Sequence, residues 1–211
     1  MDIHIFKDNI AGIASSAAIT FRAGGVVLFP TDTLYGLGAD AFSNGAVDKI
    51  YAIKGRREDK PIHALVTDLD MASRFGEMTE RIRTLAEALP KGKVTFIVRK
   101  KEGLEMGIAR GIDTFGFRIP DSELCLAIVR EFGAPITATS ANKAGEQPLR
   151  NIADILAQIG APASAIDLAI DGGELAPSQP SSVIDLSGDH PRILREGAVP
   201  VASIGAAIRA L

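Results

Sequence analysis

The sequence is poor in residues on which several common kinds of site depend. It has no tryptophan, and aromatic residues make up only 5% of its 211 positions, which argues against an aromatic platform for stacking nucleic-acid bases. The single cysteine, Cys125, excludes an internal disulfide framework and suits a reducing compartment, so we expect a cytoplasmic protein. Three scattered histidines, without H-x-x-x-H or C-x-x-C spacing, predict no metal site built from protein ligands.

Charge and hydropathy limit the partners further. The net charge of -3 lacks the basic excess of a protein that coats nucleic acid, so any anion site must be local. No apolar stretch approaches the ~20 residues that span a bilayer, and the first residues lack the pattern of a signal peptide. We therefore expect no membrane contact.

Short apolar strands mixed with amphipathic helices predict an α/β (α+β) fold, with a twisted mixed sheet flanked by helices. No linker of convincing length interrupts the chain, so we expect one domain over residues 1–211. Helices are expected within residues 9–25, 46–55, 70–76, 79–89, 121–133, 151–160 and 203–211. Strands are expected within residues 26–29, 62–67, 93–100, 115–120, 135–140, 168–170, 181–186 and 192–196.

The stretch VVLFPTDTLYGLGADAF, residues 26–42, begins as a buried strand and becomes polar and glycine-rich. We expect Pro30 to end the strand and a loop to run from Thr31 to Asp40, and ligands of open α/β sheets bind where strands end. The pattern G-x-G-x-x-A lies within this loop. It follows the strand only after six residues, and cations rather than an acid stand about 20 positions later, so we reject a dinucleotide-binding interpretation.

Two cations follow the next predicted helix. Lys54 and Arg56 flank Gly55 in KGRREDK. On a non-helical turn they could converge on one polyphosphate, lysine as a point charge and arginine as a two-donor fork. A charge run of this kind is more often a solvated surface turn, and composition alone does not establish a phosphate site.

Small polar residues follow two later strands. In TATSANKAG, Ser140 and Asn142 offer uncharged donors to a carboxylate or phosphate, or they cap the backbone of their own turn. Ser181 in APSQPSSVID raises the same choice, and LREG adds Arg195 at a strand end. Cys125 lies in an apolar helix, which favours inert packing over a nucleophile.

Taken together, FPTDTLYGLGADA, KGRREDKP, FRIP, TSAN, PSSVID and LREG resemble the YrdC-like family of L-threonylcarbamoyl-AMP synthases. The resemblance runs from about Val26 to Gly197 and implies a YrdC-like fold with a basic concave face. It implies a nucleotidyltransferase that makes threonylcarbamoyl-AMP and pyrophosphate from L-threonine, bicarbonate and ATP, with Mg²⁺ carried by ATP. The product would serve threonylcarbamoyladenosine modification of tRNA at position 37. The implied partners are downstream threonylcarbamoyl-transfer proteins and a weak RNA contact.

The resemblance also implies roles for individual residues. The catalytic signature is the tetrad Lys54, Arg56, Ser140 and Asn142. The residues expected at the nucleotide are Arg56, Lys60, Ser140, Asn142 and Arg195. The residues expected at or near threonine are Thr33, Arg118 and Ser181.

The chain departs from the family at a few positions. KGKVT, residues 91–95, stands where many relatives have P-G-P-L-T, Lys60 where relatives often have asparagine, and Leu65 where they often have histidine. Two alternatives use the same fold. An RNA-binding module would show a steep salt dependence of RNA affinity. A paralogous nucleotide-binding branch of unassigned activity lacks the tetrad, which this chain keeps.

Overall fold

The computed structural model describes residues 2–5, 9–55 and 61–210. Its strands are β1 (Asp2–Ile5), β2 (Val27–Pro30), β3 (Tyr35–Gly38), β4 (His63–Leu65), β5 (Val94–Arg99), β6 (Thr114–Arg118), β7 (Ile136–Ser140), β8 (Leu168–Asp171), β9 (Ser182–Asp185) and β10 (Arg192–Arg195). Its helices are α1 (Ile10–Arg22), α2 (Asn44–Lys54), α3 (Leu69–Ser73), α4 (Glu80–Ala88), α5 (Glu123–Phe132), α6 (Ile152–Ile159) and α7 (Val201–Arg209). Two short 3₁₀ turns are η1 (Gly107–Ala109) and η2 (Ala161–Ala165).

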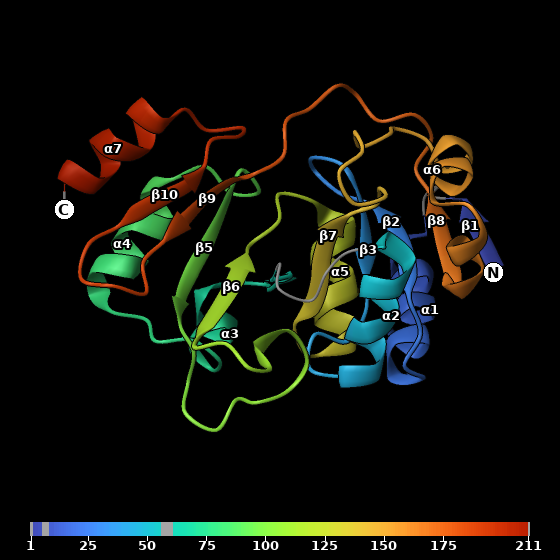
Figure 1. Cartoon of the computed structure of the whole chain (residues 1–211), viewed down its shortest axis with the longest axis horizontal. Coiled ribbons are helices and arrows are strands. Elements are labelled where there is room, and N and C mark those ends of the chain that lie inside the picture. Colours follow the sequence, from blue (N-terminus) through green and yellow to red (C-terminus); the bar gives the residue numbers. More distant parts are fainter. Residues whose placement is uncertain (1, 6–8, 56–60, 211) are drawn as a thin grey trace.

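Neighbouring strands of the sheet come from distant parts of the chain. The strand order is β1-β8-β2-β3-β7-β4-β6-β5-β9-β10. Strand β2 is antiparallel to β3 and parallel to β8, while β5 is antiparallel to β6 and parallel to β9. Figure 1 shows α1, α2 and α5 along the half of the sheet that contains β7, and α4 and α7 along the half that contains β10. The predicted mixed α/β sheet with flanking helices is confirmed.

The core follows from the apolar runs and the helix caps of the sequence. Val27, Leu28 and Phe29 of β2 are fully buried, as expected for a strand covered on both faces. Each such side chain contributes roughly 1.5–3 kcal/mol on burial. Helix α2 begins where the Ser43 hydroxyl accepts the N–H of Ala46. The chain leaves α2 at Gly55, so helix and cap together fix the position of Lys54.

The predicted loop from Thr31 to Asp40 is wrong in its second half. Strand β3 occupies Tyr35–Gly38 and pairs with β2, which continues through Pro30 opposite Tyr35. The glycines that suggested a loop are needed for packing, because a Cβ on Gly38 would lie 2.5 Å from Cε1 of Phe29. The G-x-G pattern therefore lies in a strand, which agrees with rejecting the dinucleotide-binding interpretation.

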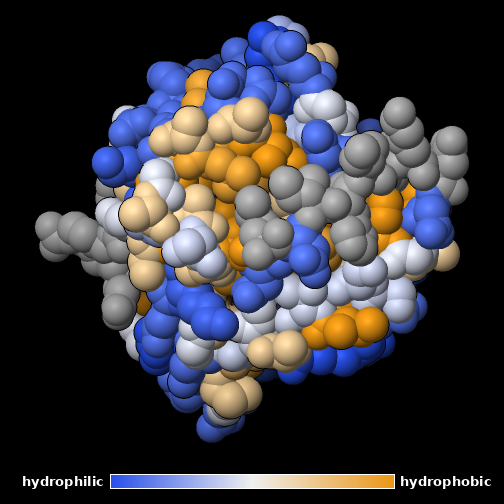
Figure 2. Space-filling view, turned by 90° about the vertical axis from the view of Figure 1, so that its right-hand side faces the viewer, coloured by the Kyte–Doolittle hydropathy of each residue, from blue (hydrophilic) through white to orange (hydrophobic). Residues whose placement is uncertain are grey.

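None of the helices in the described part of the chain combines the length and the apolar character that crossing a bilayer requires. Figure 2 shows the face at the β1 and α6 end of the molecule, where an apolar area is surrounded by hydrophilic side chains. Apolar side chains are thus partly uncovered on this face.

Candidate functional site

One pocket gathers the polar motifs. It has about 760 Å³ of empty space, including its open mouth, and residues from β3, β5, β6 and β7 contribute to its wall. Five residues predicted for the site line it: Thr33, Arg118, Ser140, Ser181 and Arg195. The described part of its wall carries two arginines and no carboxylate, so the pocket suits an anionic ligand.

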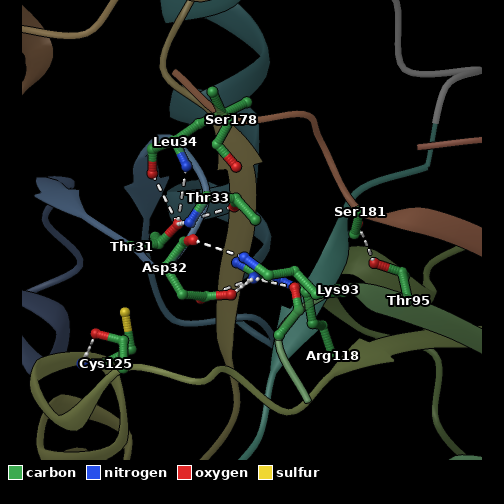
Figure 3. Close-up of polar contacts among 12 residues, drawn as sticks. Thr31, Asp32, Thr33, Leu34, Lys93, Thr95, Arg118, Cys125, Ser178 and Ser181 are labelled. Carbon is green, nitrogen blue, oxygen red and sulfur yellow. Dashed lines mark hydrogen bonds and ion pairs between the residues drawn. The ribbon is translucent and has the colours of Figure 1, made fainter. Parts of the chain in front are cut away.

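The turn between β2 and β3 is organised by the Thr31 hydroxyl. That hydroxyl donates to the Leu34 carbonyl oxygen at 2.7 Å and accepts the backbone N–H groups of Thr33 at 3.1 Å and Leu34 at 3.2 Å. The Thr33 hydroxyl lies 3.1 Å from it (Figure 3). The turn thereby holds the largely buried Thr33 at the pocket wall.

Asp32, between the two threonines, forms an ion pair with Arg118 of β6. Nη1 of Arg118 lies 2.9 and 3.0 Å from the two carboxylate oxygens, and it also donates to the Gly92 carbonyl at 2.9 Å. Both side chains are less than a tenth exposed, at 8% for Arg118 and 5% for Asp32. Nζ of Lys93 donates to the Asp32 carbonyl at 3.1 Å, so the departure KGKVT contributes directly to this cluster (Figure 3).

A second polar cluster joins β5 to the PSSVID and LREG motifs. The hydroxyls of Thr95 and Ser181 lie 2.8 Å apart, and both residues are buried. Arg195 donates to the Ser181 carbonyl from Nη2 at 2.7 Å and from Nε at 3.1 Å. Ser181 and Arg195 are therefore held together at one side of the pocket.

Three members of the predicted tetrad meet at the end of β7. Nζ of Lys54 donates to the backbone carbonyls of Ser140 and Asn142, the latter at 2.9 Å, and lies 3.3 Å from Oδ1 of Asn142. Oδ1 also accepts from the Ser140 hydroxyl. Lys54 is only 2% exposed, and Ser140 alone of the three lines the pocket. The fourth member, Arg56, and Lys60 lie outside the described residues.

Tyr35 ties the pocket to the segment that links β8 to β9, which passes from one half of the sheet to the other (Figure 1). Its hydroxyl donates to the Gly173 carbonyl at 2.8 Å and accepts the N–H of Gly172 at 2.9 Å. Burial raises the pKa of Tyr35 to about 12, and the nearby Asp171 carboxylate acts in the same direction. The phenol therefore stays neutral and serves as a fixed anchor.

Cys125 packs as the sequence predicts. Its thiol is fully buried in α5, and burial raises its pKa to about 12. A thiol that stays protonated in an apolar helix is a weak nucleophile. Among the described residues, no group of three or more histidine, cysteine, aspartate or glutamate side chains is arranged to hold a metal ion.

Sequence reasoning missed Asp32 and Thr95 as parts of the site. The only local signal for Asp32 was its position between two threonines in PTDT. Its partner Arg118 lies 86 positions away, as does the partner Ser181 of Thr95. Both pairings depend on the strand order rather than on local spacing.

The comparison with protein families decides which family this is. Residues 20–197 match the model of the Sua5/YciO/YrdC family, which carries the description "Telomere recombination". The chain belongs to this family. The resemblance found in the sequence is thereby confirmed.

Three relatives illustrate the membership. The threonylcarbamoyl-AMP synthase of Bacillus subtilis (strain 168) is 35% identical over 202 residues, which cover 95% of this chain and 57% of that protein. The crystal structure of P. abyssi Sua5 complexed with L-threonine has a TM-score of 0.87 at 31% identity, covering 98% of this chain and 60% of that one. The crystal structure of E. coli YciO has a TM-score of 0.83 at 25% identity, and the match covers 96% of this chain and 98% of that one.

The lengths of these Sua5/YciO/YrdC proteins differ. The chain spans 57% of the Bacillus subtilis synthase and 60% of the P. abyssi Sua5 chain, whereas it covers 98% of YciO. This chain therefore spans less than two thirds of each of these two longer relatives.

Proposed function

We propose that this chain is an L-threonylcarbamoyladenylate synthase, a nucleotidyltransferase that converts L-threonine, bicarbonate and ATP into threonylcarbamoyl-AMP and pyrophosphate. The name of the Bacillus subtilis relative and the L-threonine complex of P. abyssi Sua5 support this reading. The retained tetrad Lys54, Arg56, Ser140 and Asn142 supports it over the paralogous branch.

The observation that carries the proposal is the pocket itself. Thr33, Arg118 and Ser181, proposed at the threonine, and Ser140 and Arg195, proposed at the nucleotide, line one cavity although they come from five separate motifs. Arg56 and Lys60 complete the proposed nucleotide side.

The proposed chemistry needs positioning more than acid–base groups. The neutral threonine amine forms a bond to the bicarbonate carbon, one C–O bond of bicarbonate breaks, and water leaves to give a carbamate. A carbamate oxygen then forms a bond to the α-phosphorus of ATP as the bond to the β-phosphate bridging oxygen breaks, and pyrophosphate leaves. Charge grows on phosphate oxygens, so the cations of the pocket would act by electrostatic stabilisation. The carbamate is already anionic and requires no strong base.

Mg²⁺ belongs to the proposal as a companion of ATP, where it would neutralise phosphate charge. The described wall of the pocket has no carboxylate, which suits a metal held mainly by the triphosphate rather than by the protein. The residues assigned to substrate contact are then free of direct metal ligation. Their work is to bind and orient the two organic substrates.

The wider setting is also part of the proposal. We place the reaction in the cytoplasm, within a single domain over residues 1–211, upstream of proteins that transfer the threonylcarbamoyl group to adenosine 37 of tRNA. The arginines at the pocket would allow a weak contact with RNA phosphates. The net charge of -3 argues against a larger RNA-binding surface elsewhere on the protein.

One assay tests the proposed activity: pyrophosphate release from ATP and bicarbonate, with and without L-threonine. A synthase releases pyrophosphate in a threonine-dependent manner. Binding of ATP without release of pyrophosphate would favour the paralogous nucleotide-binding branch. Salt-sensitive RNA binding without pyrophosphate release would favour an RNA-binding module. Either result contradicts the proposal.

A further inference from the structure

We propose that Asp32 is the positioning residue for Arg118, and that it turns the free edge of the guanidinium toward the carboxylate of the amino-acid substrate. This inference rests on the proposed function. It assigns a role to a residue outside the predicted site set, and it concerns how the pocket holds its substrate rather than which reaction follows.

The contacts of Arg118 are divided unequally between its nitrogens. Nη1 faces three acceptors at 2.9–3.0 Å, two from the Asp32 carboxylate and one from the Gly92 carbonyl. No described residue accepts from Nε or Nη2 of Arg118, although the guanidinium carries five N–H donors. Buried donors normally have partners, and Arg118 is buried and lines the pocket. The unmatched donors therefore indicate a ligand.

The chemistry of that edge indicates the ligand group. Two parallel N–H donors of a guanidinium match the two oxygens of a carboxylate, and such pairs are shorter and stronger than neutral hydrogen bonds. The Asp32 carboxylate and the Gly92 carbonyl together hold Nη1 and restrict how the guanidinium can turn. The substrate carboxylate then binds a pair of N–H donors that is already oriented, so no free energy is lost in ordering the Arg118 side chain on binding.

Asp32 is itself held from two sides. Its carbonyl accepts from Nζ of Lys93 at 3.1 Å, and the Thr31-centred turn fixes its backbone neighbours. Its carboxylate lies against Gly92, where a Cβ would come within 2.1 Å of Oδ2. These contacts leave the carboxylate little freedom, so its orientation is passed on to Arg118 (Figure 3).

Removing the Asp32 charge has a defined consequence. A buried arginine that loses its carboxylate partner becomes an uncompensated charge and seeks other acceptors. We expect Asp32→Asn to raise the KM for L-threonine about tenfold or more, with the KM for ATP changed by less than about twofold. The ratio of threonine to L-threoninamide binding should fall as well, because the amide lacks the charge that the fork recognises.

The test combines kinetics with direct binding. KM and kcat for both substrates are measured for wild type, Asp32→Asn, Arg118→Lys and the double variant, and L-threonine binding is measured by calorimetry without ATP. If Asp32 acts through Arg118, the double variant binds threonine about as weakly as Arg118→Lys alone. Additive losses, or an unchanged threonine KM in folded Asp32→Asn, would overturn the proposal.

A matched control is available in Asp185. It is also buried, at 6% exposure, and accepts from Arg192 at 2.6 Å, but it lies outside the pocket wall. Asp185→Asn should leave both KM values unchanged. If Asp32→Asn does not fold, Lys93→Met tests the same support, with an expected rise of about threefold in the threonine KM; no rise would count against the proposal. Absence of threonine-dependent turnover in wild type would instead contradict the proposed function, and the calorimetric comparison would still test Asp32.

Discussion

Nζ of Lys54 donates to the backbone carbonyl of Asn142 at 2.9 Å, joining the last turn of α2 to a loop 88 positions later in the chain. The same ammonium donates to the carbonyl of Ser140, and Ala144 returns a backbone N–H to the Lys54 carbonyl at 2.8 Å. These contacts hold the loop that presents Ser140 to the pocket. The catalytic assignment of Lys54 stays a prediction, and the contacts favour an influence exerted through Ser140.

Lys54→Ala should destabilise the fold as well as reduce activity. The carbonyls of Ser140 and Asn142 would lose a buried charged donor, and such a loss costs roughly 1–3 kcal/mol in the free energy of unfolding. Threonine-dependent pyrophosphate release should fall in parallel, because the loop loses its support. Urea denaturation and the pyrophosphate assay measure the two effects.

Lys49→Ala is the matched control for that experiment. Lys49 lies on the same helix, and its Nζ donates to one carbonyl, that of Gly24, at 2.7 Å in an exposed position. An exposed contact of this kind contributes within about 0.5 kcal/mol. Equal destabilisation by the two variants would show that Lys54 does not hold the Ser140 loop.

Local patterns predicted the helices well because their signals are local. Ser43 caps α2 and Ser122 caps α5, and the sequence predicted a helix after each of them. Strand β3 was not predicted, because its glycines are typical of loops. In the structure Gly38 allows close packing against Phe29. The parallel pairing of β1 with β8 was not predicted either, because it joins residues 2–5 to residues 168–171, which are far apart in the sequence.

The site was predictable in part for the same reason. Hydroxyl, amide and cationic residues near strand ends marked the motifs, and five of the predicted residues line one pocket. The Asp32–Arg118 pair was not predictable from composition. Asp32 lies between β2 and β3 and Arg118 ends β6, and these strands are brought together only by the order β3-β7-β4-β6 of the folded sheet. Arg56 and Lys60 stay predictions, because they lie outside the described residues.

Gly92→Ala should disturb the pocket indirectly, by displacing Asp32. Gly92 has a φ of 73°, and its new Cβ would lie 2.1 Å from Oδ2 of Asp32. The left-handed backbone alone costs about 1–2 kcal/mol for a residue other than glycine. Displacement of Asp32 should add a rise in the KM for L-threonine, measured with the pyrophosphate assay.

Gly103→Ala separates the two contributions. Gly103 has a φ of 81°, but a Cβ there would meet nothing within 4 Å. This variant should lose stability through the backbone alone, by about 1–2 kcal/mol, with an unchanged threonine KM. A threonine KM that stays at the wild-type value in Gly92→Ala would rule out the contact with Asp32 as the link to the pocket.

Cys125 should resist alkylation in the native state. Its thiol is fully buried and its pKa is raised to about 12 by burial, so the reactive thiolate is scarce at pH 8. Iodoacetamide at pH 8 should label the protein only after denaturation in urea, as mass spectrometry can record. Rapid labelling of the native protein would contradict the inert packing of α5.

The pKa of Tyr35 predicts a loss of stability in alkali. Burial raises this pKa from 10.0 to about 12, so the folded state keeps a proton that the unfolded state releases between these values. The contribution of the protonated Tyr35 hydroxyl to the free energy of unfolding is complete below about pH 10 and is lost as the pH rises toward 12. The free energy of unfolding should therefore decline between about pH 10 and 12. Tyrosinate absorbance reports the titration, and because Tyr51 also absorbs, the step of Tyr35 is the difference between wild type and Tyr35→Phe.

Tyr35→Phe, compared in a Cys125→Ala background, isolates this effect. The background is needed because burial also raises the pKa of Cys125 to about 12, which gives an overlapping alkaline decline. Removing the phenol should abolish the absorbance step near pH 12 and flatten the slope of the unfolding free energy between about pH 10 and 12. The slope, not the absolute stability, is the readout, because Gly172 and Gly173 also lose their hydrogen-bond partner. An unchanged slope would mean that the Tyr35 hydroxyl is solvated in the folded protein, and the anchor between β3 and the β8–β9 segment would then have to come from other contacts.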